Sequence, residues 1–267
     1  MIEVIPACPK ELQTWVSPCP LTPMHEDLLR KLPYLKTLSC GVSSSEGFPE
    51  IDFLHHLENL ELSGGAYESF PLRKLPSTIK EIHLSYITLS VYAISTIAQL
   101  PNLESVILFE CKFEEGLIWN VREETKFPKL KTLQLLDVDI QIWNISYAAE
   151  SFPCLEQLLL EFCRNLRLMP SSFDDVFTLN KIVVQYCNPT VESWVKNIEE
   201  SARDIGNKQL NVKIFEPSRI NSEHESNSVN ETWNKFKLVV RVRMRKFDDM
   251  CAKIKRGERR RRKRPRV

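Results

Sequence analysis

The sequence predicts an α/β fold, a solenoid whose short parallel strands line one curved face. Two observations predict it. A spacing of apolar residues, three and then two positions apart, occurs seven times, at successive intervals of 22, 22, 24, 27, 25 and 24 residues. After the last copy the chain continues with one amphipathic segment and the alternating run LNVKIF, both of which are suited to close the end of such a stack.

Each copy consists of a first apolar residue, a second one three positions later and a third two positions after that. The seven copies are Leu35-Leu38-Cys40, Leu57-Leu60-Leu62, Ile79-Ile82-Leu84, Leu103-Val106-Leu108, Leu130-Leu133-Leu135, Leu155-Leu158-Leu160 and Leu179-Ile182-Val184. Because intervals of roughly 20–29 residues are typical of leucine-rich repeats, we predict a leucine-rich-repeat horseshoe with parallel strands on its concave face.

The spacing has a simple physical reading. Residues two apart on a strand point to the same face, so the second and third apolar residues of a copy enter the core, and the first reaches it from the bend. One repeat buries two or three such side chains at ~1.5–3 kcal/mol each, which does not offset ~1–2 kcal/mol of backbone entropy per residue. The repeats must therefore stack.

Three cysteines mark the turn after the strand. Cys111, Cys163 and Cys187 each follow the third apolar residue by three positions, where this repeat favours Asn or Cys facing the turn backbone. None of the eight cysteines forms a C-x-x-C pair, which argues against a zinc site.

A helix is expected to close the carboxyl end of the stack. It runs from Thr190, the expected N-cap, to Gly206, the expected stop, and the run at residues 210–215 would add a last strand. The apolar face of this helix consists of Val191, Trp194, Val195, Ile198, Ala202 and Ile205.

These elements divide the chain into four regions. Residues 1–187 hold the repeats, seven of them recognisable from about residue 28, and residues 188–215 form the carboxyl-terminal cap. Residues 216–232 read as a linker and residues 233–267 as a basic tail, either helical or disordered. Residues 1–31 contain at most one degenerate repeat and no cap, so we expect the chain to be the tail of something longer.

Charge separates the tail from the rest. The chain has a net charge of +1, but residues 231–267 carry +12 and residues 1–230 carry −11. The amino end lacks a secretory signal and no apolar run approaches ~18 residues, so we expect an intracellular protein, in the cytoplasm or also in the nucleus.

Catalytic patterns are missing from the sequence. It contains no glycine-rich phosphate loop, no G-x-S-x-G elbow and no H-E-x-x-H pair, and its seven glycines leave little material for a phosphate loop. We therefore expect no enzyme, no cofactor, no metal and no small-molecule substrate.

Binding is better supported, because residues between the leucines form columns on the concave face. The first three repeats place polar or small residues there, whereas repeats four to seven place apolar ones, and we expect an exposed apolar patch of the kind that marks a protein-binding surface. The predicted protein-binding residues are Ile107, Phe109, Leu136, Leu159, Phe162, Val183 and Tyr186. The alternative is that the capping helix or an irregular strand covers part of this patch.

Acidic residues border the same face and would favour a basic partner. They are Glu58, Glu61, Glu104, Glu110, Glu156 and Glu161.

The tail offers two signals. From Trp233 to Ile254 apolar residues advance by three or four positions, the period of an amphipathic helix, which could dock on a partner helix, an anionic membrane or the acidic horseshoe of its own chain. A basic cluster follows, typical of a nuclear-import signal or a nucleic-acid contact, or simply of a solvated tail. The cluster comprises Lys253, Lys255, Arg256, Arg259, Arg260, Arg261, Arg262, Lys263 and Arg264.

Three longer segments carry a family resemblance: FPKLKTLQLLDVDIQIWN, FPCLEQLLLEFCRNLRLMPSSF and VESWVKNIEESARDIGNKQLNVKIF. Together, within residues 28–215, they resemble the C-terminal leucine-rich repeats of coiled-coil-type plant NLR disease-resistance proteins, in particular the late blight resistance protein homologues. The resemblance implies an intracellular receptor whose repeats sense a pathogen effector and help to hold a nucleotide-binding switch domain off. The coiled-coil and nucleotide-binding regions have no counterpart in this sequence, so nucleotide binding is not carried over.

Two other functions stay open at this point. A leucine-rich substrate receptor of a ubiquitin ligase is suggested faintly by HEDLLRKLP, but the first repeat at Leu35 leaves no room for the helices of an F-box. A nuclear or nucleic-acid-associated scaffold would make the basic tail the primary functional element.

Overall fold

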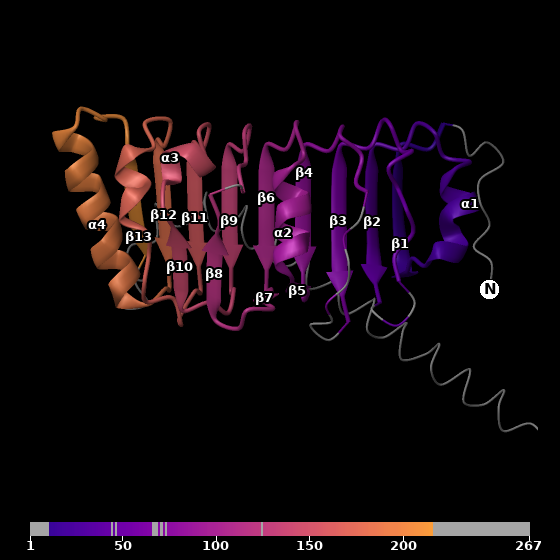
Figure 1. The fold of residues 1–267 in the computed structure, drawn as a ribbon, viewed down its shortest axis with the longest axis horizontal. Helices are drawn as coiled ribbons and strands as arrows, with labels where there is room; N and C mark the ends of the chain where they lie inside the picture. Colours follow the sequence, from indigo (N-terminus) through magenta and orange to yellow (C-terminus); the bar gives the residue numbers. More distant parts are fainter. Residues whose placement is uncertain are drawn as a thin grey trace, which may run out of the picture.

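The structure is a computed structural model and describes residues 11–215, except residues 44, 46, 66–68, 70, 71, 73 and 124. Its centre is one sheet of nine parallel strands in the order β1-β2-β3-β4-β6-β9-β11-β12-β13, laid side by side along the molecule (Figure 1). The strands are β1 (Thr14–Pro20), β2 (Thr37–Val42), β3 (Asn59–Gly64), β4 (Glu81–Ser85), β6 (Ser105–Phe109), β9 (Thr132–Leu136), β11 (Gln157–Glu161), β12 (Lys181–Gln185) and β13 (Asn211–Phe215).

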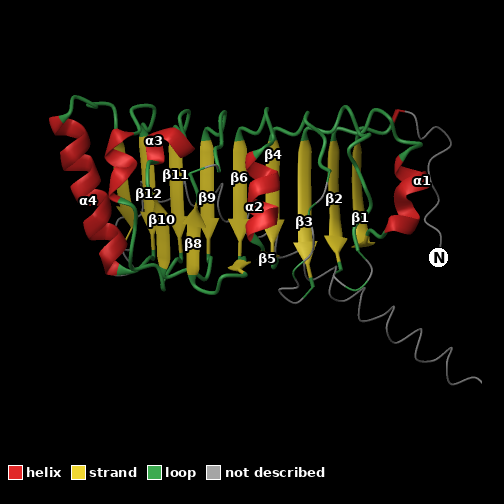
Figure 2. Cartoon of the chain, viewed as in Figure 1, coloured by secondary structure: helices red, strands yellow, loops and turns green. Residues whose placement is uncertain are grey.

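The segments that return from one strand to the next lie over one face of this sheet. Figure 2 shows helix α2 and strands β8 and β10 in front of the large sheet. The opposite face carries the outward side chains of the strands, and we call it the concave face. The return elements are η2 (Pro23–His25), α1 (Glu26–Leu29), β5 (Thr88–Leu89), α2 (Val91–Ala98), β7 (Lys112–Phe113), β8 (Ile118–Val121), β10 (Ile142–Ile145), α3 (Ala148–Ser151) and η3 (Ser171–Asp175).

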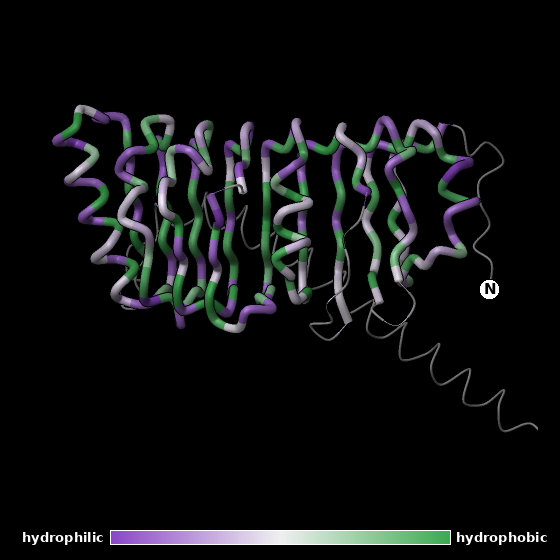
Figure 3. The backbone as a smooth tube through the Cα atoms, viewed as in Figure 1, coloured by the Kyte–Doolittle hydropathy of each residue, from purple (hydrophilic) through white to green (hydrophobic). Residues whose placement is uncertain are grey.

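The apolar spacing of the sequence becomes a set of columns in the sheet. Leu38 lies opposite Leu60 and Leu60 opposite Ile82, and the same register continues through the later strands. All three apolar positions of all seven copies are buried, with exposed fractions of 0 to 4%. In Figure 3, hydrophobic residues alternate with polar ones along the strands. The predicted leucine-rich-repeat solenoid is confirmed.

The turn cysteines bond to backbone, as expected. The thiol of Cys111 donates to the carbonyl of Leu84 in the preceding repeat at 3.4 Å, and that of Cys163 donates to Leu135 at 3.5 Å. Burial raises the pKa of Cys111 to about 12, so the thiol keeps its proton and remains a donor. Each thiol is thereby hydrogen-bonded to a strand carbonyl of the preceding repeat.

Aromatic side chains fill the interior between the sheet and the return segments of the later repeats. Phe113 stacks on Trp119 at 5.2 Å between ring centroids, and Trp119 stacks on Trp143 at 4.8 Å. Trp143 meets Phe173 edge-on at 5.3 Å, and Phe173 meets Trp194 at 5.7 Å. Large rings therefore occupy the added space in the longest repeats, which contain β8 and β10.

The carboxyl-terminal cap is helix α4 (Pro189–Asp204), which packs beside β12 and β13. The predicted N-cap was wrong by two residues. Asn188 is the cap, and its side-chain oxygen accepts a hydrogen bond from the backbone N–H of Thr190 at 3.0 Å. The helix can begin at Pro189 because proline has no N–H to satisfy at the first helical position.

Most of the predicted apolar face of α4 is packed. Val191, Val195, Ile198 and Ala202 are buried, and the Trp194 indole donates to the carbonyl of Pro170 at 2.7 Å. Ile205 is 47% exposed, so its assignment to this face was wrong; the helix ends one residue earlier. Gly206 terminates it with a left-handed φ of 97°, as the sequence predicts.

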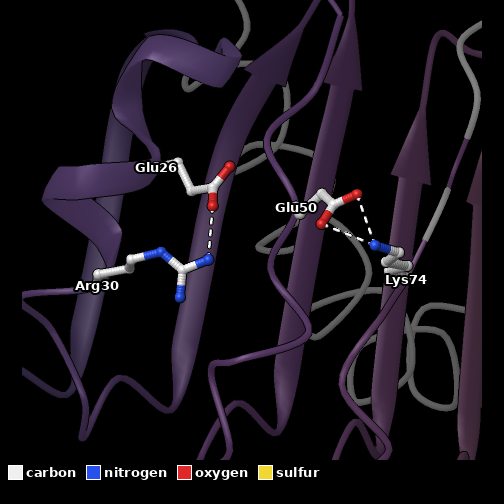
Figure 4. Close-up of polar contacts among 4 residues, drawn as sticks. All are labelled: Glu26, Arg30, Glu50 and Lys74. Atoms are coloured by element: carbon white, nitrogen blue, oxygen red, sulfur yellow. Dashed lines mark hydrogen bonds and ion pairs between the residues drawn. The ribbon is translucent and has the colours of Figure 1, made fainter.

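Exposed ion pairs connect side chains of the first repeats. Arg30 bonds Glu26 at 2.6 Å within the helical turn, and Lys74 bonds Glu50 at 2.9 Å between successive repeats (Figure 4). Since these side chains are about a third to more than half exposed, water and salt screen both pairs and their contribution to stability is small. Stability therefore rests on the stacked core.

One glycine is required by close packing between repeats. A Cβ at Gly64 would overlap the carbonyl oxygen of Tyr86, whereas a Cβ at Gly65 would meet nothing within 4 Å. We expect Gly64→Ala to lower the free energy of unfolding by about 1–3 kcal/mol, because backbone must move to admit the methyl group.

Urea denaturation of the two alanine variants checks this expectation. Gly65→Ala is the matched control and should stay within about 0.5 kcal/mol of the wild type. Equal stability of the two variants would contradict the packing argument.

Candidate functional site

The concave face presents two columns of outward side chains at the centre of the sheet. Register places Ser39, Glu61, His83, Ile107, Gln134, Leu159, Val183 and Lys213 in the first column. It places Gly41, Ser63, Ser85, Phe109, Leu136, Glu161, Gln185 and Phe215 in the second. The polar first half and apolar second half expected from the sequence thus lie on one continuous surface.

A third row lies where five successive strands end, and we call it the exit row. Its members have left-handed φ angles between 47° and 57° and are Tyr86, Glu110, Asp137, Phe162 and Tyr186. Each backbone N–H donates to the carbonyl of the last strand residue in the next repeat, for example Glu110 to Leu136 at 2.8 Å and Tyr186 to Phe215 at 3.2 Å. These hydrogen bonds between repeats therefore hold five residues other than glycine in a backbone conformation that usually favours glycine.

All seven predicted protein-binding residues lie on the concave face or in its exit row. Ile107, Phe109 and Leu136 form an apolar cluster separate from the main core, and Tyr86 packs against it. Phe109 pairs in register with Leu136 and meets Tyr86 edge-on at 5.5 Å, so these side chains cover one another.

Exposure differs from the sequence-based expectation. Ile107, Phe109 and Leu136 are 1 to 6% exposed, Val183 is 5% exposed and Leu159 is 8% exposed. The prediction that these five form an exposed patch was wrong, because burial depends on neighbours in adjacent strands. Phe162 and Tyr186 are half-buried and stack at 5.0 Å between ring centroids. Whether any of the seven binds a partner stays a prediction.

The predicted acidic border is partly neutralised by lysines of the following repeat. Lys80 lies 3.4 Å from the carboxylate of Glu58, and Lys131 lies 2.9 Å from that of Glu104. The Lys131 hydrogen bond and charge hold the pKa of Glu104 below its ordinary value. These two carboxylates therefore contribute less to the field of the concave face than the sequence suggested.

Other carboxylates lie within the face itself. The positions concerned are the outward strand residues of β3, β4, β6, β9 and β11 and the exit row beside them. Five of these positions are acidic and, in this described part of the chain, none holds Lys or Arg. The five are Glu61, Glu81, Glu110, Asp137 and Glu161. Lysines reappear only on the last two strands, at Lys181 and Lys213.

Local contacts tie these carboxylates to the surface. The Tyr86 hydroxyl donates to Glu110 at 3.2 Å, and His83 lies 3.8 Å from the carboxylate of Glu61. Partial burial and then the charge of Glu61 raise the pKa of Glu81 above its ordinary value. Both desolvation and the neighbouring carboxylate disfavour the ionised form of Glu81, and a cationic partner would favour it.

Sequence reasoning missed Tyr86, Glu81 and Asp137 as members of this surface. A signal was present, since each exit-row residue directly precedes the turn position occupied by cysteine or an aliphatic residue, as in Glu110-Cys111 and Asp137-Val138.

The described residues lack the features of a metal site and of a membrane-spanning helix. They contain no group of three His, Cys, Asp or Glu side chains placed to hold a metal ion. None of the described helices is long and apolar enough to cross a membrane. A cavity of about 480 Å³ opens beside β10 on the face of the return segments, lined by Asn120, Asn144 and Leu168 among others.

The parallel ladder, the stacked core and the variable outward columns define a leucine-rich-repeat protein. No protein-family model matches the chain. Late blight resistance protein R1-A of Solanum demissum is 34% identical over 196 residues, which are 72% of this chain and 15% of that protein. Two putative late blight resistance protein homologues of the same plant, R1B-13 and R1B-16, are 34% and 32% identical over 71% and 78% of this chain.

This chain is thus related to the late blight resistance proteins and their homologues over about 72% of its length, and the resemblance expected from the sequence is confirmed. It spans only about 15 to 17% of the length of these relatives.

The raised pKa of Glu81 predicts a pH-dependent effect on stability. Because the ionised carboxyl is disfavoured in the fold, Glu81→Gln should raise the free energy of unfolding at neutral pH. As pH falls through the raised pKa, the wild-type carboxyl takes up its proton and the gap between the two proteins should close.

Urea denaturation at neutral and acidic pH measures this gap. Glu114→Gln, at an exposed carboxyl in the turn after β7, is the control and should show no such trend. A destabilising effect of Glu81→Gln at neutral pH would contradict the electrostatic account.

Proposed function

We propose that this chain is the protein-recognition module of a plant intracellular immune receptor and acts in disease resistance by binding alone. Three findings support the proposal: the relation to late blight resistance proteins, the solenoid fold and the mixed acidic and aromatic concave face. The partner is a pathogen effector protein or the nucleotide-binding domain of an immune receptor, and binding to that domain would regulate a switch.

The observation that carries the proposal is the Phe162–Tyr186 pair of the exit row. Two stacked aromatic rings, half-buried at the ends of β11 and β12, match the composition of interface hot spots. Because the backbone N–H groups of both residues are fixed by the ladder, the rings are pre-organised, which lowers the entropy cost of binding.

The proposal includes no catalysis, no cofactor and no small-molecule substrate. It places the protein in the cytoplasm, with the nucleus as a second compartment if the basic cluster of residues 253–264 engages an import receptor. That cluster, and any contact of it with nucleic acid or membrane, lies outside the described residues.

The test uses the accessible part of the surface. Glutamate at Phe109 or Leu159, which are 4% and 8% exposed, would unfold the sheet and report nothing about binding. The double variant Phe162→Ala and Tyr186→Ala should instead weaken binding about tenfold or more, as expected for aromatic hot-spot residues. Calorimetry with a cognate effector, or with the nucleotide-binding domain supplied separately, measures the change.

A matched control removes two exposed aromatic side chains elsewhere. Tyr92 and Phe177 are 84% and 66% exposed, and their double alanine variant should bind as the wild type does. If Phe162→Ala and Tyr186→Ala leave affinity for both partners unchanged, this assignment of the surface is wrong.

A further inference from the structure

The concave face and the carboxyl-terminal tail have opposite charge within one chain. The face carries Glu61, Glu81, Glu110, Asp137 and Glu161 over five consecutive strands. Residues 231–267 carry a net charge of +12, and residues 1–230 carry −11. Such opposite fields attract, and attraction within one chain needs no second molecule.

The position at which the described chain ends also favours a contact between the tail and the concave face. β13 ends at Phe215, which belongs to the column that also contains Glu161, Leu136 and Phe109. The described part of the chain therefore ends at the edge of the sheet along which the exit row runs. Only β12 separates β13 from the strand that carries Glu161.

The linker is long enough to bring the tail over the acidic strands. Residues 216–232 have a root-mean-square span of about 20–25 Å if they behave as a flexible chain. Five strand steps separate β13 from β4, and at about 4.8 Å each they amount to roughly 24 Å. The effective concentration of the tail at the acidic strands is then in the mM range, so weak attraction between individual charges is enough for the tail to bind there.

The tail also matches the face in its apolar pattern. Trp233, Phe236, Val240, Met244 and Phe247 fall on one side of a helical period, with Lys and Arg on the others. The concave face offers the half-buried aromatic side chains of the exit row, Tyr86, Phe162 and Tyr186, beside the acidic ones. A basic amphipathic segment satisfies both features at once.

We propose that residues 233–267 dock in cis on the concave face, with basic side chains against Glu81, Glu110 and Asp137. Docked there, the tail occupies the surface that an external partner would use. A nucleic acid or an anionic membrane is a less favourable occupant of this face, because phosphates would meet the carboxylates of Glu81, Glu110 and Asp137. This inference does not rest on the proposed immune function, since its test contains no external partner.

Zero-length coupling of lysine amines to carboxylates tests the contact in the full-length protein. At low protein concentration and low salt, the tail lysines should couple within one chain to Glu81, Glu110 or Asp137 in preference to Glu114, Glu123 or Asp175, which lie outside the concave face. High salt should abolish the preference, because screening shortens to about 3 Å at 1 M.

Tryptic cleavage of the tail provides the second measurement. Glu81→Gln, Glu110→Gln and Asp137→Asn together should speed cleavage about three- to tenfold, as expected from loss of three partly exposed ion pairs. The control triple variant Glu114→Gln, Glu123→Gln and Asp175→Asn changes the net charge equally and should cleave as the wild type does. Circular dichroism verifies that both triple variants fold.

Three results would overturn the inference. One is equal cleavage of the wild type and both triple variants. Another is coupling that favours the control carboxylates or forms only between chains as concentration rises. The third is protection of the tail only when anionic vesicles or nucleic acid are added, which would assign the tail to those partners.

Discussion

The spacing of about 4.8 Å between parallel strands is the constraint on which the rest of this molecule depends. It forces equivalent residues of successive repeats into contact, so each position of the repeat becomes a column. Leu38, Leu60 and Ile82 bury one another in this way, and no single repeat contains a core of its own. The same rule acts on polar groups, since the Cys111 thiol reaches the carbonyl of Leu84 in the previous repeat. Stability is therefore shared along the sheet.

The outward side chains form columns with the same spacing between strands, but these columns contain charged and aromatic residues as well as apolar ones. Neighbours in a column lie too close to be independent, and so Phe109 and Leu136 become an apolar floor although both point out of the main core. On β4, next to the strand of Glu61, partial burial and then the charge of Glu61 raise the pKa of Glu81. A surface built in this way accumulates charge and apolar area in stripes, which suits the recognition of extended or helical segments.

Much of this architecture could be predicted from the sequence because the repeat has leucine or a close substitute at its inner positions. All seven strands containing Leu38 to Ile182 follow from that spacing. The sequence-based predictions that were wrong depended on contacts that the repeat spacing does not specify. The side chain of Thr190 suits the role of a cap, but Pro189 lets the helix begin earlier, with Asn188 as its cap. The five outward apolar residues are buried by cross-strand neighbours, which a linear pattern does not reveal. The Trp119–Trp143 stack depends on a second, two-stranded sheet that no leucine pattern predicts.

The exit row has a consequence for how such a surface can change over generations. Each of its five residues incurs a backbone penalty of roughly 1 kcal/mol for a left-handed φ, which glycine would avoid. Replacing Phe162 or Tyr186 by glycine would therefore remove this backbone penalty, which partly offsets the lost side-chain contacts. The reverse change, from glycine to a larger residue, would restore the penalty. Side chains along this edge can therefore change from one generation to the next at little cost to stability, while the solenoid beneath them endures.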